Sequence, residues 1–98
     1  MGPNEKLTPI LAGRKVKSAS QSDNLLVVTF TDGSTMKVKT GAPAPTAALQ
    51  AHTVKMVRQD GMVMELDFSD NSKAQIRLAE ETSSVMLRDA KGKFEYAD

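Results

Sequence analysis

Glu65 and Asp67 stand two positions apart in a segment where apolar and polar residues alternate. In an extended strand this spacing places both carboxylates on one face, roughly 6 to 7 Å apart, a separation that glycosidases use for an acid and a base. The same alternation is typical of any strand with one solvent-exposed face. We therefore expect Glu65 and Asp67 to face water, and we assign them no catalytic role.

Other catalytic residue types are scarce. The chain has one histidine, His52, and no cysteine, so disulfides, thiolate zinc sites, iron–sulfur clusters and cysteine nucleophiles cannot form. No acidic residue stands at metal-ligand spacing from His52, and we expect no metal site and no cofactor. Ser34 and Ser72 lack the Gly-x-Ser-x-Gly context of a nucleophile elbow, and the chain has no glycine-rich phosphate loop. The sequence predicts a protein that is not an enzyme.

Lysines near the start of the chain could contact phosphates. The whole chain has a formal net charge of only +1, but residues 1–40 carry +3 and residues 79–98 carry −2. A basic stripe would form if the strands that carry these lysines shared one sheet face. Lysine on an edge strand is equally an ordinary guard against edge-to-edge pairing. The lysines expected to contact phosphates are Lys15, Lys17, Lys37 and Lys39.

The segment Leu25–Phe30 is expected to form a strand that is apolar on both faces. One face would point into the core, which leaves Leu25 and Val27 on the other. A chain of 98 residues has little mass with which to cover a second sheet face. Leu25 and Val27 therefore predict a contact face for a protein partner or for self-association. The alternative is that a helical turn around Ile10 and Leu11 covers them.

The elements that would position these side chains are short strands. Apolar and polar residues alternate in brief runs, of which Met62–Phe68 is the clearest, with every second residue apolar. The intervals of roughly 10 residues suit hairpins, which predicts an antiparallel meander, because parallel strands need long crossovers. Dipeptides that tolerate a positive φ separate the runs, at Asp32-Gly33, Asp60-Gly61, Asp70-Asn71 and Lys91-Gly92.

Residues 8–40 also align without gaps with residues 46–78, at an offset of 38. Eight of the 33 aligned pairs are identical, where chance would give about two. Phe30 aligns with Phe68, and the two Asp turns align with each other. The alignment predicts an internal repeat, and the alternative is two similar meanders with accidental identities. Both interpretations predict the same local structure.

We therefore predict a mainly β fold in a single domain over residues 1–98. It contains two structurally similar antiparallel units of about 38 residues, a proline-rich connector over residues 40–45 and a C-terminal hairpin over residues 82–96. The strands would form a small barrel or two packed sheets, with Phe30 and Phe68 in a common interior. One or two short helical turns are expected, the first with Thr8 as its N-cap.

Targeting signals and membrane spans are not apparent. Near the start, only Ile10–Ala12 are consecutively apolar, far fewer than the roughly 7 to 15 residues in the apolar region of a signal sequence. No segment approaches the roughly 20 apolar residues of a membrane helix. The sequence predicts a cytoplasmic, non-catalytic module for protein–protein interaction or a structural role, without membrane contact. The alternative function is a nucleic-acid-binding module that uses the basic first unit.

Overall fold

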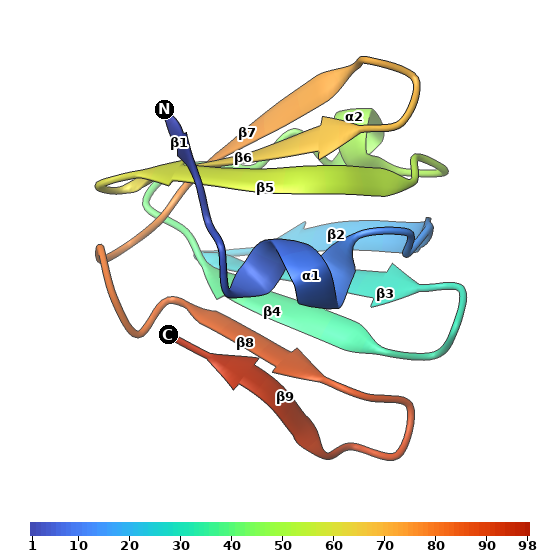
Figure 1. Cartoon of the computed structure of the whole chain (residues 1–98). Helices are drawn as coiled ribbons and strands as arrows, with labels where there is room; N and C mark the ends of the chain where they lie inside the picture. Colours follow the sequence, from blue (N-terminus) through green and yellow to red (C-terminus); the bar gives the residue numbers. More distant parts are fainter.

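Two antiparallel β-sheets lie one above the other in the computed structural model, which describes residues 1–98, and the core fills the space between them (Figure 1). Two short helices, α1 (Leu7–Leu11) and α2 (Thr46–Leu49), pack beside the sheets. The four-stranded sheet has the order β1 (Gly2–Pro3), β5 (Val54–Asp60), β6 (Val63–Phe68), β7 (Lys73–Arg77). The five-stranded sheet has the order β2 (Val16–Ser22), β3 (Leu25–Phe30), β4 (Thr35–Lys39), β8 (Val85–Arg88), β9 (Phe94–Ala97).

The predicted mainly β, antiparallel fold class is confirmed, and of the two architectures considered the structure has two packed sheets rather than a closed barrel. The connector over residues 40–45 leads from β4 to α2, and the C-terminal hairpin is formed by β8 and β9. Strand β1 was not predicted, because two residues show no alternation. It pairs with β5 through Gly2 opposite Gln59 and Pro3 opposite Arg58.

The strands β2, β3 and β4 have the same topology as β5, β6 and β7. Both units carry a β-bulge at their first strand, at Lys17 and at Lys55, which are 38 residues apart. Isolated antiparallel bridges join Lys15 to Thr53 and Thr40 to Leu78, again 38 residues apart in each case. Since each bridge pairs a residue with its own equivalent, the two units are related by an approximate local twofold axis.

The core contains both equivalent phenylalanines. Phe30 is 0% exposed and Phe68 is 1% exposed, and they belong to one cluster of 19 buried apolar residues contributed by both sheets. The expectation of a common interior is confirmed. The helices contribute Leu7, Leu11 and Leu49 to the same cluster. Helices this short are unstable alone, so packing against the sheets must stabilise them.

The capping residue expected for the first helix was wrong. The backbone N–H groups of Lys6 and Leu7 donate to the side-chain oxygen of Asn4, which therefore caps the helix. Thr8 lies inside α1, where its hydroxyl donates to the Val57 carbonyl and accepts from the Val57 N–H. The Thr8 side chain thus attaches α1 to the edge of β5.

A second difference concerns Met62, which was expected on the apolar face of the strand. Strand β6 begins at Val63, and Met62 lies in the two-residue turn after Asp60, with 38% of its surface exposed. Gly61 has a φ of +58° there, and Asp23 has a φ of +51° at the equivalent turn of the first unit. The two turn residues are therefore Gly61 and Met62, not Asp60 and Gly61. The residue in the left-handed conformation is the first of the two, Gly61.

Replacing either buried ring should destabilise the whole protein. We expect Phe30→Ala and Phe68→Ala each to lower the free energy of unfolding by about 3 to 5 kcal/mol, because each leaves a cavity in the shared core. Phe94 is 60% exposed and contacts Arg88 through a cation–π interaction. Phe94→Ala is the matched control, with an expected cost of about 1 kcal/mol. Urea denaturation measures all three, and core substitutions no costlier than the control would contradict a common interior.

Candidate functional site

Leu25 and Val27 lie on the outer face of the five-stranded sheet, opposite the core. Both are partly exposed, while Leu26, Val28 and Phe30 on the inner face are buried. Opposite Leu25 on β4 is Lys39, and opposite Val27 is Lys37. Both lysines are exposed. The structure therefore brings the predicted partner face and two of the predicted phosphate-contacting lysines onto one surface.

A groove of about 350 Å³ crosses this outer face where β3 and β8 begin and β4 and β9 end. Its apolar floor includes Leu25 and Met86, and Met86 is paired across β4 and β8 with Lys37. Lysine stems can cover apolar surface while their ammonium groups stay in water. The groove can therefore accept an apolar side chain beside the two positive charges of β4. The lining residues are Leu25, Lys37, Lys39, Ser83, Ser84, Val85, Met86, Ala97 and Asp98.

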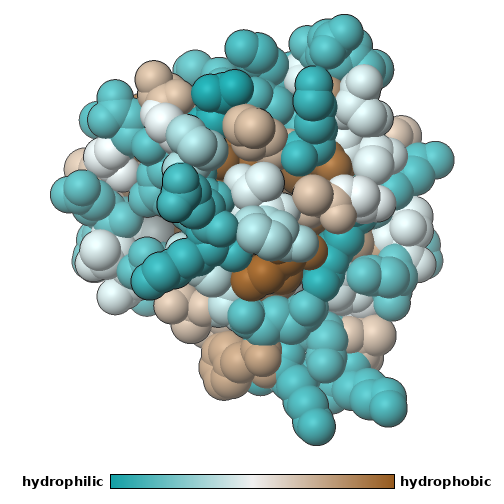
Figure 2. Space-filling model, in the orientation of Figure 1, coloured by the Kyte–Doolittle hydropathy of each residue, from teal (hydrophilic) through white to brown (hydrophobic).

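The helical turn that could have covered Leu25 and Val27 lies elsewhere. Helix α1 packs against β5, and its Leu11 side chain is buried in the core. The alternative in which residues around Ile10 and Leu11 cover this face is wrong. Hydrophilic side chains dominate the view that includes α1, where hydrophobic areas are small (Figure 2).

Lys15 and Lys17 do not line the groove. Lys15 is bridged to Thr53 just before β2, and Lys17 is the extra residue of the β2 bulge. Strand β3 separates β2 from β4, so both lysines lie across β3 from Lys37 and Lys39. Two of the four lysines are therefore at the groove, and two are beside the start of β2.

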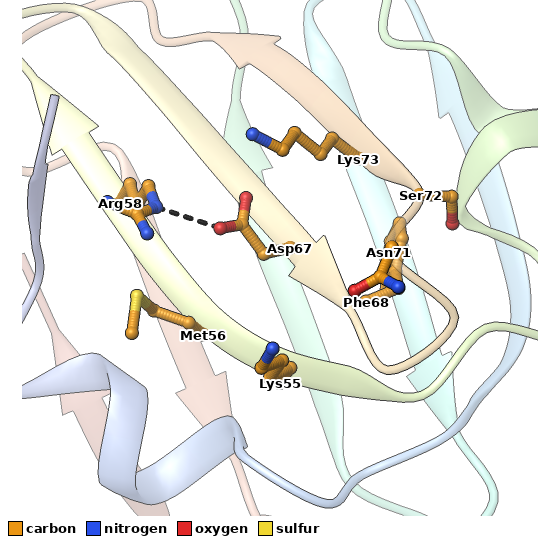
Figure 3. Close-up of a pocket in the computed structure, with 8 residues that line it drawn as sticks. All are labelled: Lys55, Met56, Arg58, Asp67, Phe68, Asn71, Ser72 and Lys73. Atoms are coloured by element: carbon orange, nitrogen blue, oxygen red, sulfur yellow. Dashed lines mark hydrogen bonds and ion pairs between the residues drawn. The ribbon is translucent and has the colours of Figure 1, made fainter.

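The outer face of the other sheet carries a charged hollow of about 240 Å³ (Figure 3). Glu65 is only 8% exposed and the Asp67 side chain 13%, so the expectation that they face water was wrong. The Arg58 Nε donates to the Asp67 carboxylate at 2.8 Å, and the Gln75 amide donates to Glu65 at 3.2 Å. Long neighbouring side chains on β5 and β7 shield the acidic pair. The hollow is lined by Lys55, Met56, Arg58, Asp67, Phe68, Asn71, Ser72 and Lys73.

The Asp67 carboxyl is held in its charged form. Burial acts to raise its pKa, but the hydrogen bond from Arg58 and the nearby positive charges outweigh burial, and the pKa of Asp67 is lowered. A general acid needs the opposite shift. The arrangement around Asp67 therefore does not favour the acid role that its spacing from Glu65 could suggest.

His52, Asp70 and Ser72 form a cluster of the residue types found in hydrolase triads. The His52 Nδ1 lies 3.0 Å from the Asp70 carboxylate and 3.4 Å from the Ser72 hydroxyl, and that hydroxyl donates to Asp70. In a triad the Ser and the Asp contact opposite ring nitrogens. Here both contact the same nitrogen, so Asp70 cannot orient the ring through one nitrogen while the other takes the proton of Ser72.

The equivalent cluster in the first unit shows what this arrangement does. Arg14 replaces His52, with its Nε 3.7 Å from Asp32, and the Ser34 hydroxyl and N–H both donate to Asp32. In each unit the side chain two residues before the first strand contacts the Asp turn between the second and third strands. The sequence signal for these contacts was the 38-residue offset, which aligns Arg14 with His52.

Hydrogen bonds shift the ionisation of these groups. The Ser34 hydroxyl, and then its N–H, lower the pKa of Asp32, and the Ser72 groups lower the pKa of Asp70 in the same way. Arg14 also makes a bidentate pair with Glu95, at 2.6 and 2.9 Å, and this hydrogen bonding raises the pKa of Arg14. The first unit is thereby joined to β9.

No protein-family model, curated protein or solved structure matches this chain. No helix is long and apolar enough to cross a membrane. The structure contains no group of three or more His, Asp or Glu side chains that could hold a metal ion.

The groove residues that sequence reasoning missed, chiefly Met86 and Ser83, come from a segment whose position beside β4 only the folded chain shows.

The Asp32 contacts predict acid sensitivity. Because the folded state lowers the pKa of Asp32 from 3.8, its stabilisation is complete above that pH and is lost as the pH falls through the folded pKa. We expect Asp32→Asn to lower the free energy of unfolding at pH 7 by up to about 1 kcal/mol, and to weaken its pH dependence between about pH 5 and pH 2. Urea titrations across this range test it.

Asp60→Asn provides the control, because the Asp60 carboxylate accepts no hydrogen bond in the structure and its replacement should leave the profile unchanged. Equal effects of the two substitutions would mean that the turn contacts of Asp32 do not stabilise the fold.

Proposed function

We propose that this protein is a non-catalytic protein–protein interaction module whose binding surface is the groove on the outer face of the five-stranded sheet. One observation carries the proposal: the partly exposed Leu25 and Val27 lie directly opposite the exposed Lys39 and Lys37. Leu25 and both lysines line the groove, and Val27 lies on the same face beside it. Soluble proteins seldom leave a contiguous apolar surface uncovered unless it binds something. A cytoplasmic location, and a true internal repeat underlying the two units, belong to the same proposal.

The chemistry of the groove specifies the kind of partner. Lys37 and Lys39 form no salt bridge within the protein, not even with Asp98 in the same groove, so an acidic partner would supply their missing counter-charges. Leu25 on β3 and Met86 on β8 flank the two lysines of β4 and offer apolar contact on either side of them, and Met adapts to irregular partners. The best-matched occupant is a protein segment in which an apolar side chain is flanked by Asp or Glu.

A nucleic-acid-binding function remains the alternative, supported by the same two exposed lysines. Binding to single strands would also require exposed aromatic rings on which bases stack. Phe94 is the one strongly exposed aromatic ring, and the Arg88 guanidinium lies 3.9 Å from its centroid. Phe30 and Phe68 are in the core and cannot stack on bases. This shortage of ring surfaces favours a protein partner.

The proposal predicts binding of a short peptide in which a leucine is flanked by glutamates. We expect it to shift the NMR amide signals of Leu25, Lys37, Lys39 and Met86, and to bind more weakly as salt increases. Leu25→Glu and Lys39→Glu should each weaken binding at least about tenfold, since each places a like charge against the peptide. Thr29→Glu, on the same face of β3 but outside the groove, is the matched control.

Stability measurements and a second ligand complete the test. Leu25→Glu should change the free energy of unfolding by less than about 1.5 kcal/mol, and a cost above about 3 kcal/mol would make Leu25 a core residue and remove the partner argument.

If a single-stranded oligonucleotide shifts the groove signals with a steep salt dependence and the peptide does not, the nucleic-acid alternative replaces the proposal. Binding of neither ligand refutes both.

A further inference from the structure

The edge of β7 that faces away from β6 has unused backbone hydrogen-bonding groups. In an antiparallel strand, alternate residues direct their N–H and C=O groups to the same side. The Arg77 carbonyl accepts from the N–H of Gly41, which is outside the sheet, so the Arg77 backbone groups point away from β6. Gln75 and Lys73 are the alternate residues before Arg77, and their backbone groups therefore point away from β6 as well. No strand pairs with that side of β7, and beyond the bond from Gly41 no backbone hydrogen bond reaches it.

The first unit shows what the equivalent edge does when it is occupied. Strand β4 corresponds to β7, and β8 pairs with its outer edge, with Arg88 opposite Thr35 and Met86 opposite Lys37. The residues of β7 equivalent to Thr35 and Lys37 are Lys73 and Gln75. The protein therefore contains its own template for a strand added to β7, including the antiparallel direction and the register.

The side chains of β7 favour an acidic partner. Lys73, Gln75 and Arg77 are exposed, and neither Lys73 nor Arg77 forms a salt bridge. The acidic groups on neighbouring β6 are engaged elsewhere, since Asp67 binds Arg58 and Glu65 accepts from Gln75. In Figure 3 the Lys73 side chain extends over the hollow from β7. Asp67, opposite Lys73, acts on it only through space, so an incoming strand would meet two positive charges that form no salt bridge.

A second copy of this chain fits the edge poorly. Pairing β7 with its own copy around Gln75 would place Lys73 opposite the partner's Arg77, and like charges directly opposite are destabilising. Pairing with β9 of another copy would offer Glu95, but both oxygens of that carboxylate already bind Arg14. The charges therefore favour a different protein.

We propose that β7 binds an extended acidic segment of another protein as an added antiparallel strand, opposite Lys73–Arg77, in the register that β8 adopts on β4. Backbone hydrogen bonds would supply affinity, and the acidic side chains of the segment would pair with Lys73 and Arg77. The Gly41 contact at Arg77 marks one end of the available edge. This site is on the other sheet from the groove and does not depend on the groove's function.

Amide hydrogen exchange of the full chain tests this proposal, with a short synthetic peptide in which glutamate alternates with valine. The Ala74 and Ile76 amides already face β6, so binding should newly protect only the alternate amides, those of Lys73, Gln75 and Arg77. We expect the protection to require low to moderate salt, and to be absent for a peptide with lysine in place of glutamate or with proline in its middle.

Gln75→Pro is the sharpest variant. It deletes the N–H that points off the sheet and leaves the backbone β6–β7 bonds in place, and proline is tolerated on edge strands. Gln75→Ala is its matched control, because both variants lose the side-chain bond to Glu65 and only proline lacks the N–H. We expect binding to weaken at least about fivefold, the effect of one net hydrogen bond. If this variant does not fold, the combined Lys73→Glu and Arg77→Glu substitutions should abolish peptide binding, while Lys91→Glu, in the exposed β8–β9 turn, should not.

The possible results separate this site from the groove. Alternating protection at Lys73 and Gln75 that disappears in the variants supports an added strand. Unchanged exchange at those amides overturns it, as does binding that survives Gln75→Pro undiminished. Signal shifts confined to Leu25, Lys37 and Met86 also overturn it, and they leave the proposed groove function standing.

Discussion

The structure depends on one interior that two sheets must fill together. Each three-stranded unit has only one apolar face, and a sheet this small gains little stability until that face is covered. Phe30 from one unit and Phe68 from the other are both buried in the resulting core. The bridges of Lys15 to Thr53 and Thr40 to Leu78 join the sheets where equivalent residues meet. Burial of the common core therefore holds the two units face to face, and the bridges set the register of one unit against the other.

The inner faces of the two units must be alike, but their outer faces are free to differ. At three equivalent outer positions the first unit has Leu25, Val27 and Thr29. The second unit has Val63, Glu65 and Asp67 there. One scaffold thus presents a partly apolar groove beside lysines on one side and a network of paired charges on the other. Because the differences fall on surfaces that the core does not constrain, they are where binding specificity can arise.

Sequence reasoning located the features that depend on neighbouring residues. Alternation and turn residues predicted the antiparallel strands and the burial of Phe30 and Phe68, since both follow from side-chain direction along one strand. It put Glu65 and Asp67 on the correct, outer face but overestimated their exposure, because their shielding comes from Arg58 and Gln75 on adjacent strands. It named Leu25 and the lysines of β4 separately, but only strand pairing could show that they share a groove with Met86.

The additions to the two units explain why the edge of β7 stays open. An unpaired strand edge invites association, and proteins usually cover such edges or place charges on them. Here β1 covers the edge of β5, and β8 covers the edge of β4, but the chain supplies no strand for β7. Lys73 and Arg77 instead oppose pairing with a second copy through like-charge repulsion. The same charges attract an acidic strand, so protection against self-association and selection of a partner follow from one pair of side chains.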